Sequence, residues 1–413
     1  MNVELIAGCR LCGKSELIPI LELGDLPLAN ALKRALEEPE LRYPLTLMFC
    51  PGCALVQIRE TVDKTLLFSR YVWLTGTSAT ARRFAHEFCR NAQRVRPLAP
   101  GDLVVEVASN DGTFLRPFLD QGLIAVGVDP ATNIADIANA RGIPTVCAFW
   151  DDEVAQEIVA RYGRAKLVVA RNVVAHVSEL HRVMAGFRQV LDDDGVGAVE
   201  FHAAATILDG LQYDAIYHEH LCYFSLASFE RLLALHDLHP FHVDLSPISG
   251  GAYVVYFSTR QRPSSPTYRA AAESEHRAGV DEVTAWRAFE LRCKEHRERS
   301  RELMGTFLGR TVVGFGASAR SATYLNFCRF TRTEIAAIID NNGLKHGHYA
   351  PGSAIPIVSA SDGFRLAPDL IFLLGWNFRE EILDACRERG YAGDVLVPFP
   401  NQPSLLRGTG RTA

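Results

Sequence analysis

Four consecutive side chains, Tyr217, His218, Glu219 and His220, combine the groups that proton transfer needs. A histidine with a near-neutral pKa can remove a proton, a nearby carboxylate can orient its ring, and a phenol can polarise an oxygen. His-x-His spacing also suits a metal in an extended segment, but no third ligand is obvious. A polar helix start that only caps backbone groups is the structural alternative. We favour proton transfer.

A polar turn after the first strongly apolar stretch is a second candidate site. Residues Leu103–Val107 predict a buried parallel strand, and Ser109, Asn110 and Gly112 lie in the turn that leads into an apolar helical pattern. Such a turn presents backbone N–H groups and admits a ligand close to the main chain. A single glycine fits neither a phosphate-cradling loop nor the three-glycine dinucleotide fingerprint.

Acidic residues mark the ends of this strand and of the next one. The apolar run Ile124–Val128 predicts the second strand, and Asp129 follows it directly. An acid at that tip is where a doubly wound fold holds the two hydroxyls of a ribose. With Glu106 or Asp111 near the first tip, this is the pattern of an S-adenosylmethionine (SAM) site. An ordinary α/β domain with exposed acids at strand ends is the alternative.

The N-terminal segment carries two Cys-x-x-Cys knuckles, formed by Cys9 with Cys12 and by Cys50 with Cys53. Two such turns make a tetrahedral four-cysteine site, which is the usual closed structural zinc site. A thioredoxin-like redox pair would predict one knuckle at a helix start, so zinc is favoured. Because four thiolates leave the metal no open position, we expect a role in folding and not in catalysis.

These groups need a scaffold, and residues 101–200 supply a repeating βαβ pattern. Further strands are expected at Pro144–Cys147, Leu167–Ala170 and Gly197–Phe201. By the switch-point rule, the loop of residues 171–177 lies over the carboxyl ends of the strands, beside the cofactor. Before the sheet, Thr77 or Ser78 is expected to cap a helix at Ala79–Arg94.

A second Rossmann-like unit is expected over residues 309–413, after a long predicted helix at residues 281–308. Its strands begin near Thr311, Ile335 and Leu370. Gly314 and Gly316 give two of the three fingerprint glycines, which is a weak dinucleotide signal. We interpret this half as binding part of a substrate, such as its nucleotide, in preference to NAD.

The composition excludes several classes of protein. A chain of 413 residues is too long for one core, so two or three domains are expected. A net charge of −5 and a pI near 6.2 argue against a general nucleic-acid or membrane-surface binder. There is no apolar run long enough for a transmembrane helix and no visible signal peptide. We therefore expect a cytoplasmic protein with no nucleic-acid or membrane partner, as a monomer or weak dimer.

Taken together, these motifs resemble the sugar C-methyltransferases over nearly the whole chain. The resemblance rests on the two cysteine knuckles and on VEVASNDGTFL, QYDAIYHEHLCYFSL, VVGFGASARSATYLNF, DNNGLKHGHYAPGSAIPI and GWNF. It implies an α/β protein with a zinc-binding domain at residues 1–65, a Rossmann-like SAM-dependent methyltransferase domain at 66–285 and a second Rossmann-like, substrate-binding domain at 286–413. The implied substrate is a nucleotide-linked, typically dTDP-linked, 4-keto-deoxysugar, methylated on a carbon beside the ketone, typically C3.

The resemblance also implies roles for individual residues. His220 would abstract the proton alpha to the ketone, Tyr217 and Glu219 would steady the enolate or orient His220, and Tyr71 would lie near both ligands. The expected cofactor-binding residues are Glu106, Ser109, Asn110, Gly112, Asp129 and Asn172. Substrate binding is expected at Tyr223, His181, Lys345 and Asn377, and structural zinc at Cys9, Cys12, Cys50 and Cys53.

Two segments depart from the family pattern and leave the acceptor open. The family tends to have Val-Pro-Tyr where this chain reads Glu200–Ala205, and Ser-Leu-Arg where it reads Ala252–Val254. One alternative is a SAM-dependent O- or N-methyltransferase in which His220 deprotonates a hydroxyl or an amine. Another is a non-catalytic protein whose zinc unit and second Rossmann domain bind partners, against which the intact group from Tyr217 to His220 argues.

Overall fold

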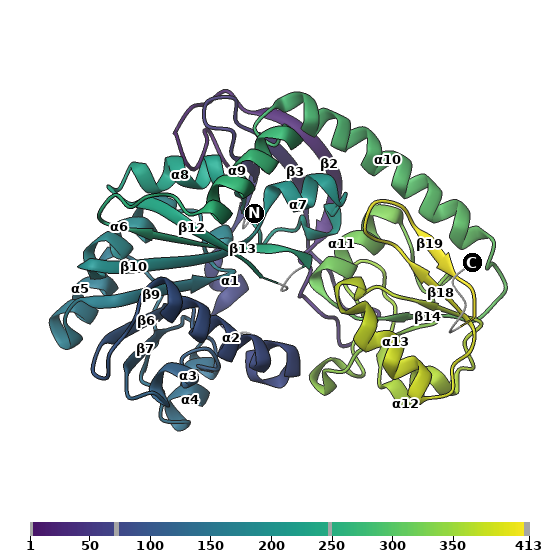
Figure 1. Ribbon diagram of the computed structural model, residues 1–413. Helices are drawn as coiled ribbons and strands as arrows, with labels where there is room; N and C mark the ends of the chain where they lie inside the picture. The colour runs from purple at the N-terminus through teal and green to yellow at the C-terminus, as the bar shows by residue number, and fades with distance from the viewer. Residues whose placement is uncertain (1–2, 70–73, 247–249, 409–413) are drawn as a thin grey trace.

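Uninterrupted apolar runs build a seven-stranded central sheet in the computed structural model, which describes residues 3–69, 74–246 and 250–408 (Figure 1). Its strands are β12 (His239–Ser246), β13 (Ala252–Ser258), β10 (Leu191–His202), β9 (Ala165–Arg171), β6 (Leu103–Val107), β7 (Ile124–Val128) and β8 (Thr145–Val146), in that spatial order. The five strands from β10 to β8 are parallel, and β13 runs antiparallel to both of its neighbours. Every residue of β6 is buried, because helices cover both faces of the sheet.

The five strands predicted between residues 101 and 200 are confirmed. The fifth is longer than predicted, because β10 begins at Leu191 and passes through a register irregularity before Val196. The chain places β7 and β8 on one side of β6 and β9 on the other, so the switch point falls between β6 and β9. The turn after β6 and the loop after β9 therefore meet at one edge of the sheet.

Helices flank this sheet and connect its strands. They are α2 (Ala79–Val95), α3 (Arg116–Leu119), α4 (Thr132–Ala140), α5 (Asp152–Tyr162), α6 (Leu180–Val190), α7 (Ala204–Asp209), α8 (Leu226–Ala234) and α9 (Pro266–Ala278). Ser78 caps α2 by accepting a hydrogen bond from the Ala81 amide, as predicted.

The N-terminal unit is a four-stranded antiparallel sheet that borrows one strand from the central segment. Its strands are β11 (Cys222–Tyr223), β4 (Val56–Ile58), β3 (Arg42–Phe49) and β2 (Ile18–Pro27). A ribbon of β1 (Val3–Leu5) with β5 (Glu60–Val62) and the short helix α1 (Lys64–Phe68) complete the unit. Because β11 begins two residues after His220, the segment that carries Tyr217–His220 is fixed to the N-terminal sheet.

The C-terminal unit is a six-stranded, mostly parallel sheet. Its strands are β16 (Ile357–Val358), β15 (Ala337–Ile339), β14 (Val312–Phe315), β17 (Leu370–Phe372), β18 (Asp394–Val397) and the antiparallel β19 (Ser404–Leu406). Its helices are α11 (Ala319–Cys328), α12 (Ala360–Arg365) and α13 (Arg379–Glu388). The predicted long connecting helix is α10 (Val283–Gly305), which arches from the central unit to this one in Figure 1.

Glycine is required where two turns of this unit touch. Gly316 has a φ of +103°, and a Cβ there would lie 2.7 Å from the Gly375 nitrogen. The turn after β14 therefore packs directly on the turn after β17. None of the helices in the described ranges is long and apolar enough to cross a membrane.

Candidate active site

The four knuckle thiols converge on one point, and their Sγ atoms all lie within 4.8 Å of one another. The Cys9 and Cys53 sulfurs are 3.5 Å apart, as are those of Cys12 and Cys50. Tetrahedral zinc with Zn–S bonds of about 2.3 Å places its sulfurs roughly 3.8 Å apart, so the cluster fits this ion. The predicted zinc-binding unit is thus present, and its geometry leaves no open ligand position.

His181 links this zinc unit to the central domain. Its Nε2 donates to the Leu11 carbonyl, 2.9 Å away inside the first knuckle. In the neutral ring, Nδ1 then accepts from Nε2 of His236 at 3.1 Å. These contacts place the expected substrate residue His181 at the junction of two units, where both ring nitrogens have protein partners.

The turn after β6 has the features that a polar ligand needs. The Oε2 atom of Glu106 and the Oγ atom of Ser109 are buried and have no hydrogen-bond partner among the described residues. Such unpaired groups are costly in a folded protein unless a ligand or water completes them. A SAM molecule over this turn would supply polar atoms for both, so these residues fit the cofactor.

Asp129 at the tip of β7 shapes this turn. Its carboxylate accepts from the Asn110 and Ala131 amides, each at 2.9 Å. Asn110 has a φ of +50° and Gly112 a φ of +74°, so the chain doubles back sharply here. Because a Cβ on Gly112 would lie 2.3 Å from the Ile143 side chain, glycine also allows the turn to pack closely.

The segment before α2 closes over the turn of residues 108–113 after β6. This turn holds most of the expected cofactor residues and is called the cofactor turn below. Residues Thr75–Thr77 form a 3₁₀ turn in which the Thr75 amide donates to Asn110 Oδ1 at 2.9 Å. The Gly76 amide donates to Asp111 Oδ2 at 3.1 Å. Tyr71, which was expected near both ligands, lies outside the described residues.

A buried charge network lies under the switch point. Arg171 at the end of β9 contacts Glu106 at 3.0 Å and Glu200 at 3.4 Å. Burial raises the pKa of Glu106 to about 7, although Arg171 opposes the shift. Asn172 follows with a φ of +51°, and its amide donates to the Glu200 carbonyl. Sequence analysis placed Arg171 in the loop over the strand ends but did not predict its ion pairs with Glu106 and Glu200.

Tyr217 and His220 form a hydrogen-bonded pair. The His220 Nδ1 atom lies 3.0 Å from the Ala215 carbonyl, which can only accept, so Nδ1 carries the proton. The Nε2 atom is then unprotonated and accepts from the Tyr217 hydroxyl at 2.7 Å. This tautomer leaves Nε2 as the basic nitrogen of the ring, and the Tyr217 hydroxyl occupies its lone pair.

The surroundings of His220 keep its ring neutral. The His176 ring packs edge-on against it, with centroids 4.6 Å apart. Burial, together with the nearby imidazoles of His176 and His202, lowers the pKa of His220 well below its ordinary value. The imidazole of His220 is therefore uncharged at neutral pH.

Glu219 points away from this pair, toward the N-terminal unit. Its Oε1 accepts from Asn30 Nδ2 at 2.7 Å, and burial raises the pKa of the carboxyl to about 7. Neighbouring His218 donates through Nε2 to the Pro44 carbonyl at 3.0 Å. Sequence analysis missed Asn30, which lies too far along the chain for any local signal.

The C-terminal unit holds the other side of the same loop. Arg320 forms a two-pronged ion pair with Asp214, at 2.7 and 2.9 Å, and Trp376 donates to the same carboxylate at 2.8 Å. Thr323 Oγ1 donates to the Ile216 carbonyl at 3.1 Å. Arg320 and Thr323 both belong to α11, and their partners Asp214 and Ile216 flank Ala215. The Ala215 carbonyl in turn orients His220.

The remaining expected substrate residues are spread over this region. The Tyr223 hydroxyl lies 3.5 Å from the Ala215 carbonyl, beneath the Tyr217–His220 pair. Lys345 donates to the Ala317 carbonyl at 2.7 Å and contacts Asp340, beyond the carboxyl ends of β14 and β15. Asn377 is half-buried in the 3₁₀ turn after β17. Their roles stay predictions.

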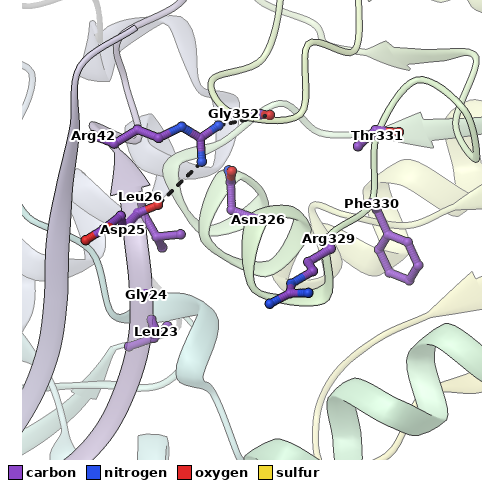
Figure 2. Close-up of a pocket in the computed structure, with 10 residues that line it drawn as sticks. All are labelled: Leu23, Gly24, Asp25, Leu26, Arg42, Asn326, Arg329, Phe330, Thr331 and Gly352. Atoms are coloured by element: carbon purple, nitrogen blue, oxygen red, sulfur yellow. Dashed lines mark hydrogen bonds between the residues drawn. The ribbon is translucent and has the colours of Figure 1, made fainter.

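A separate cavity of about 350 Å³ lies between β2 and the end of α11 (Figure 2). Arg42 spans its upper edge, donating to the Asp25 and Gly352 carbonyls at 3.4 Å each. Its guanidinium also pairs with Glu40 at 3.1 Å. The lining contains none of the expected site residues, and we assign no ligand to it.

Three family models match the chain in succession. A zinc binding domain matches residues 9–68, a methyltransferase domain matches 80–243, and a C-methyltransferase C-terminal domain matches 247–400. Together with the sheet order and the cofactor turn, these matches define a SAM-dependent methyltransferase.

Its family follows from a full-length relative. The C-methyltransferase NovU of Streptomyces niveus is 33% identical over 411 residues, which cover 98% of each chain. The chain belongs to this C-methyltransferase family. The expected zinc-binding unit, methyltransferase domain and C-terminal domain are thereby confirmed, as is SAM as the cofactor.

Solved structures match only part of the chain. A SAM-dependent methyltransferase from Anabaena variabilis is 17% identical, with a TM-score of 0.36 over 48% of this chain and 91% of that one. The magnesium protoporphyrin IX methyltransferase of Synechocystis PCC 6803 with bound SAM is 12% identical, with a TM-score of 0.33 over 43% and 79%. These scores describe partial similarity, and nothing further is drawn from them.

Proposed function

We propose that this enzyme methylates the carbon alpha to the ketone, typically C3, of a nucleotide-linked 4-keto-deoxysugar, with dTDP as the expected nucleotide. The observation that carries the proposal is the Tyr217–His220 pair, whose loop contacts His176 in the segment after β9 and Arg320 in the C-terminal unit. The carbon alpha to a ketone becomes nucleophilic only after it loses a proton. A C-methyltransferase therefore depends on a base more strongly than an O-methyltransferase does. The motifs shared with the sugar C-methyltransferases support the substrate class.

The unprotonated nitrogen of His220 is the base. Nε2 takes the proton from the alpha carbon, and the electrons of that C–H bond move into an enolate. The Ala215 carbonyl keeps the other nitrogen protonated and then stabilises the imidazolium that forms.

Tyr217 supplies the second group that the enolate needs. In the structure its hydroxyl donates to His220 Nε2. Substrate binding shifts this donation to the ketone oxygen, which polarises the carbonyl and frees the lone pair on Nε2. One residue thus holds the base ready and stabilises the charge that the base creates.

The cofactor side positions the methyl group. Bound SAM supplies an electrophilic methyl that needs only to be placed in line with the alpha carbon. Glu106, Ser109, Asn110, Gly112 and Asp129 would hold it over the β6 turn, with Asn172 beside its methionine end. The hydrogen bond between Asn30 and Glu219 attaches the loop of residues 212–221, here called the catalytic loop, to the N-terminal unit.

Solvent exchange tests the proposal directly. The enzyme is incubated in D₂O with S-adenosylhomocysteine and a panel of dTDP-4-keto-deoxysugars, and the protons alpha to the ketone are followed by NMR. We expect one alpha proton to exchange with the wild-type enzyme and not with His220→Asn. With SAM present, the new methyl should appear on that same carbon.

The opposite results are equally clear. Exchange that persists in His220→Asn would remove His220 from the role of base. Methyl transfer to an oxygen or nitrogen, with no alpha exchange, would replace the proposal with the O- or N-methyltransferase alternative.

A further inference from the structure

The imidazole of His202 is an unexplained polar group in the core of the enzyme. It ends β10, is 7% exposed, and its Nε2 atom has no hydrogen-bond partner among the described residues. No step assigned above uses it. Because buried polar groups are almost always paired, this nitrogen is available to hydrogen-bond a group that the described residues do not supply.

The position of His202 supports this reading. Its Cα pairs with that of Ala252 on β13, directly after the Gly250–Gly251 turn. The chain just after His202 contacts the loop that carries His220, because the Ala204 amide donates to the Phe224 carbonyl at 2.9 Å. Gln212 Nε2 donates to the Gly250 carbonyl at 3.4 Å, and a Cβ on Gly250 would lie 3.4 Å from Arg320 Nη1. The ring therefore sits at the catalytic loop, on the side that faces the C-terminal unit.

The charges on this side are neutralised. Burial and the nearby Arg320 lower the pKa of His202 to about 3, so its ring is uncharged at neutral pH. Arg320 itself is held in its ion pair with Asp214 and by Gln212 Oε1 at 3.1 Å. The neutral His202 ring and the Arg320–Asp214 ion pair together carry no net charge. Such surroundings suit an uncharged oxygen of a ligand and not a phosphate or a carboxylate.

We propose that His202 is a specificity-determining residue whose Nε2 atom hydrogen-bonds a ring hydroxyl of the acceptor. The inference rests on the proposed function, because it places the acceptor ring at Tyr217 and His220. The ketone oxygen is already assigned to Tyr217, which leaves a hydroxyl as the uncharged oxygen for His202. A neutral imidazole and a hydroxyl can each donate or accept, so the contact needs no change of protonation.

The test compares acceptors that differ by one oxygen. His202→Phe keeps the ring volume and removes both nitrogens, and His202→Gln restores a hydrogen-bonding group. His86→Phe, on the exposed face of α2, is the matched control. Each variant is assayed with dTDP-4-keto-6-deoxyhexoses that carry or lack single ring hydroxyls, including dTDP-4-keto-6-deoxyglucose and its 2-deoxy analogue.

We expect His202→Phe to raise KM about tenfold to a hundredfold for the acceptors that carry the recognised hydroxyl. The KM for the analogue that lacks this hydroxyl should not change. His202→Phe should therefore lose the wild-type preference for acceptors that carry the hydroxyl. His202→Gln should recover part of the preference, and the affinity for S-adenosylhomocysteine should not change in any variant.

Other outcomes overturn the inference. An equal loss for every acceptor, with the loss in kcat, would show that His202 only supports the fold. Unchanged kinetics in His202→Phe would show that Nε2 meets no acceptor atom. If the wild-type enzyme neither exchanges nor methylates any sugar of the panel, the proposed function fails and this inference fails with it.

Discussion

The hydroxyl of Tyr217 lies 2.7 Å from Nε2 of His220, on the one nitrogen of that ring that can accept a proton. The tautomer is set by Ala215, whose carbonyl accepts a hydrogen bond from the protonated Nδ1 on the other side of the ring. A phenol and a base thus share one hydrogen bond before the substrate arrives. Substitutions of these two residues and of the residues that hold them should therefore change the rate of the reaction.

Tyr217→Phe should slow both alpha-proton exchange and methyl transfer by about a hundredfold, because the enolate loses its hydrogen-bond donor. The tautomer of His220 should persist, since Ala215 still sets it. Exchange by NMR and single-turnover methyl transfer measure the effect. Binding of S-adenosylhomocysteine serves as the control, and an unchanged rate would remove Tyr217 from the mechanism.

Glu219→Gln should change how stability depends on pH. Burial raises the folded-state pKa of Glu219 from 4.5 to about 7, so its stabilising contribution is complete below pH 4.5 and is lost as the pH rises through 7. Glutamine does not titrate and can still accept from Asn30.

The variant should therefore gain up to about 3 kcal/mol in unfolding free energy relative to wild type between pH 4.5 and pH 8. Urea unfolding at several pH values measures this, with Glu273→Gln on the exposed face of α9 as the control. A difference that stays constant with pH would mean that Glu219 does not titrate in this range.

Removing the zinc should abolish activity, although the metal does not touch the reacting atoms. Structural zinc contributes on the order of 10 kcal/mol to the folding of such units. Cys12→Ser should lose the metal, and the sheet that anchors the loop through β11 should then unfold. Metal content and methyl transfer are measured together. Cys147→Ser, at an exposed single cysteine, should keep both, and a zinc-free active enzyme would contradict the expectation.

Asp214→Asn should break the link between α11 and the catalytic loop. Arg320 would remain largely buried without its charge partner, which costs about 3–5 kcal/mol. We expect a lower Tm and a reduced kcat with no change in the affinity for S-adenosylhomocysteine. Asp384→Asn removes the partner of Arg387 on the surface and should be silent. Equal effects of the two substitutions would show that the buried pair is unimportant.

Gly127→Ala should weaken cofactor binding. A Cβ at this position in β7 would lie 2.2 Å from the Ser109 Oγ, so the cofactor turn must shift. We expect the affinity for S-adenosylhomocysteine to fall about tenfold, as measured by calorimetry. Gly305→Ala meets no atom within 4 Å and serves as the control. Unchanged affinity would place the cofactor away from this turn.

Local sequence signals were enough for the scaffold and for the metal site. The strands of both Rossmann-like units are continuous apolar runs, and the knuckles are short motifs, so each carries its own signal. The strand β11 has only two residues and pairs with β4 across a long stretch of chain, which no periodicity reveals.

Contacts made at long range were the ones that sequence analysis missed. Asn30 reaches Glu219 from 189 residues away, and Arg320 reaches Asp214 from 106. Arg320 stood in a quoted motif, but its partner could only come from the fold. The roles of Lys345 and Asn377 stay predictions, as does that of Tyr71.

The pairing of β11 with β4 has a practical consequence for anyone who recombines such enzymes. Residues Cys222 and Tyr223 pair with Gln57 and Val56 in one sheet, so the boundary between the first two units in space is not a boundary along the chain. A chimera that takes its first 65 residues from a relative receives β4 from that relative but keeps its own β11. It should retain activity only when the relative also supplies residues 212–225.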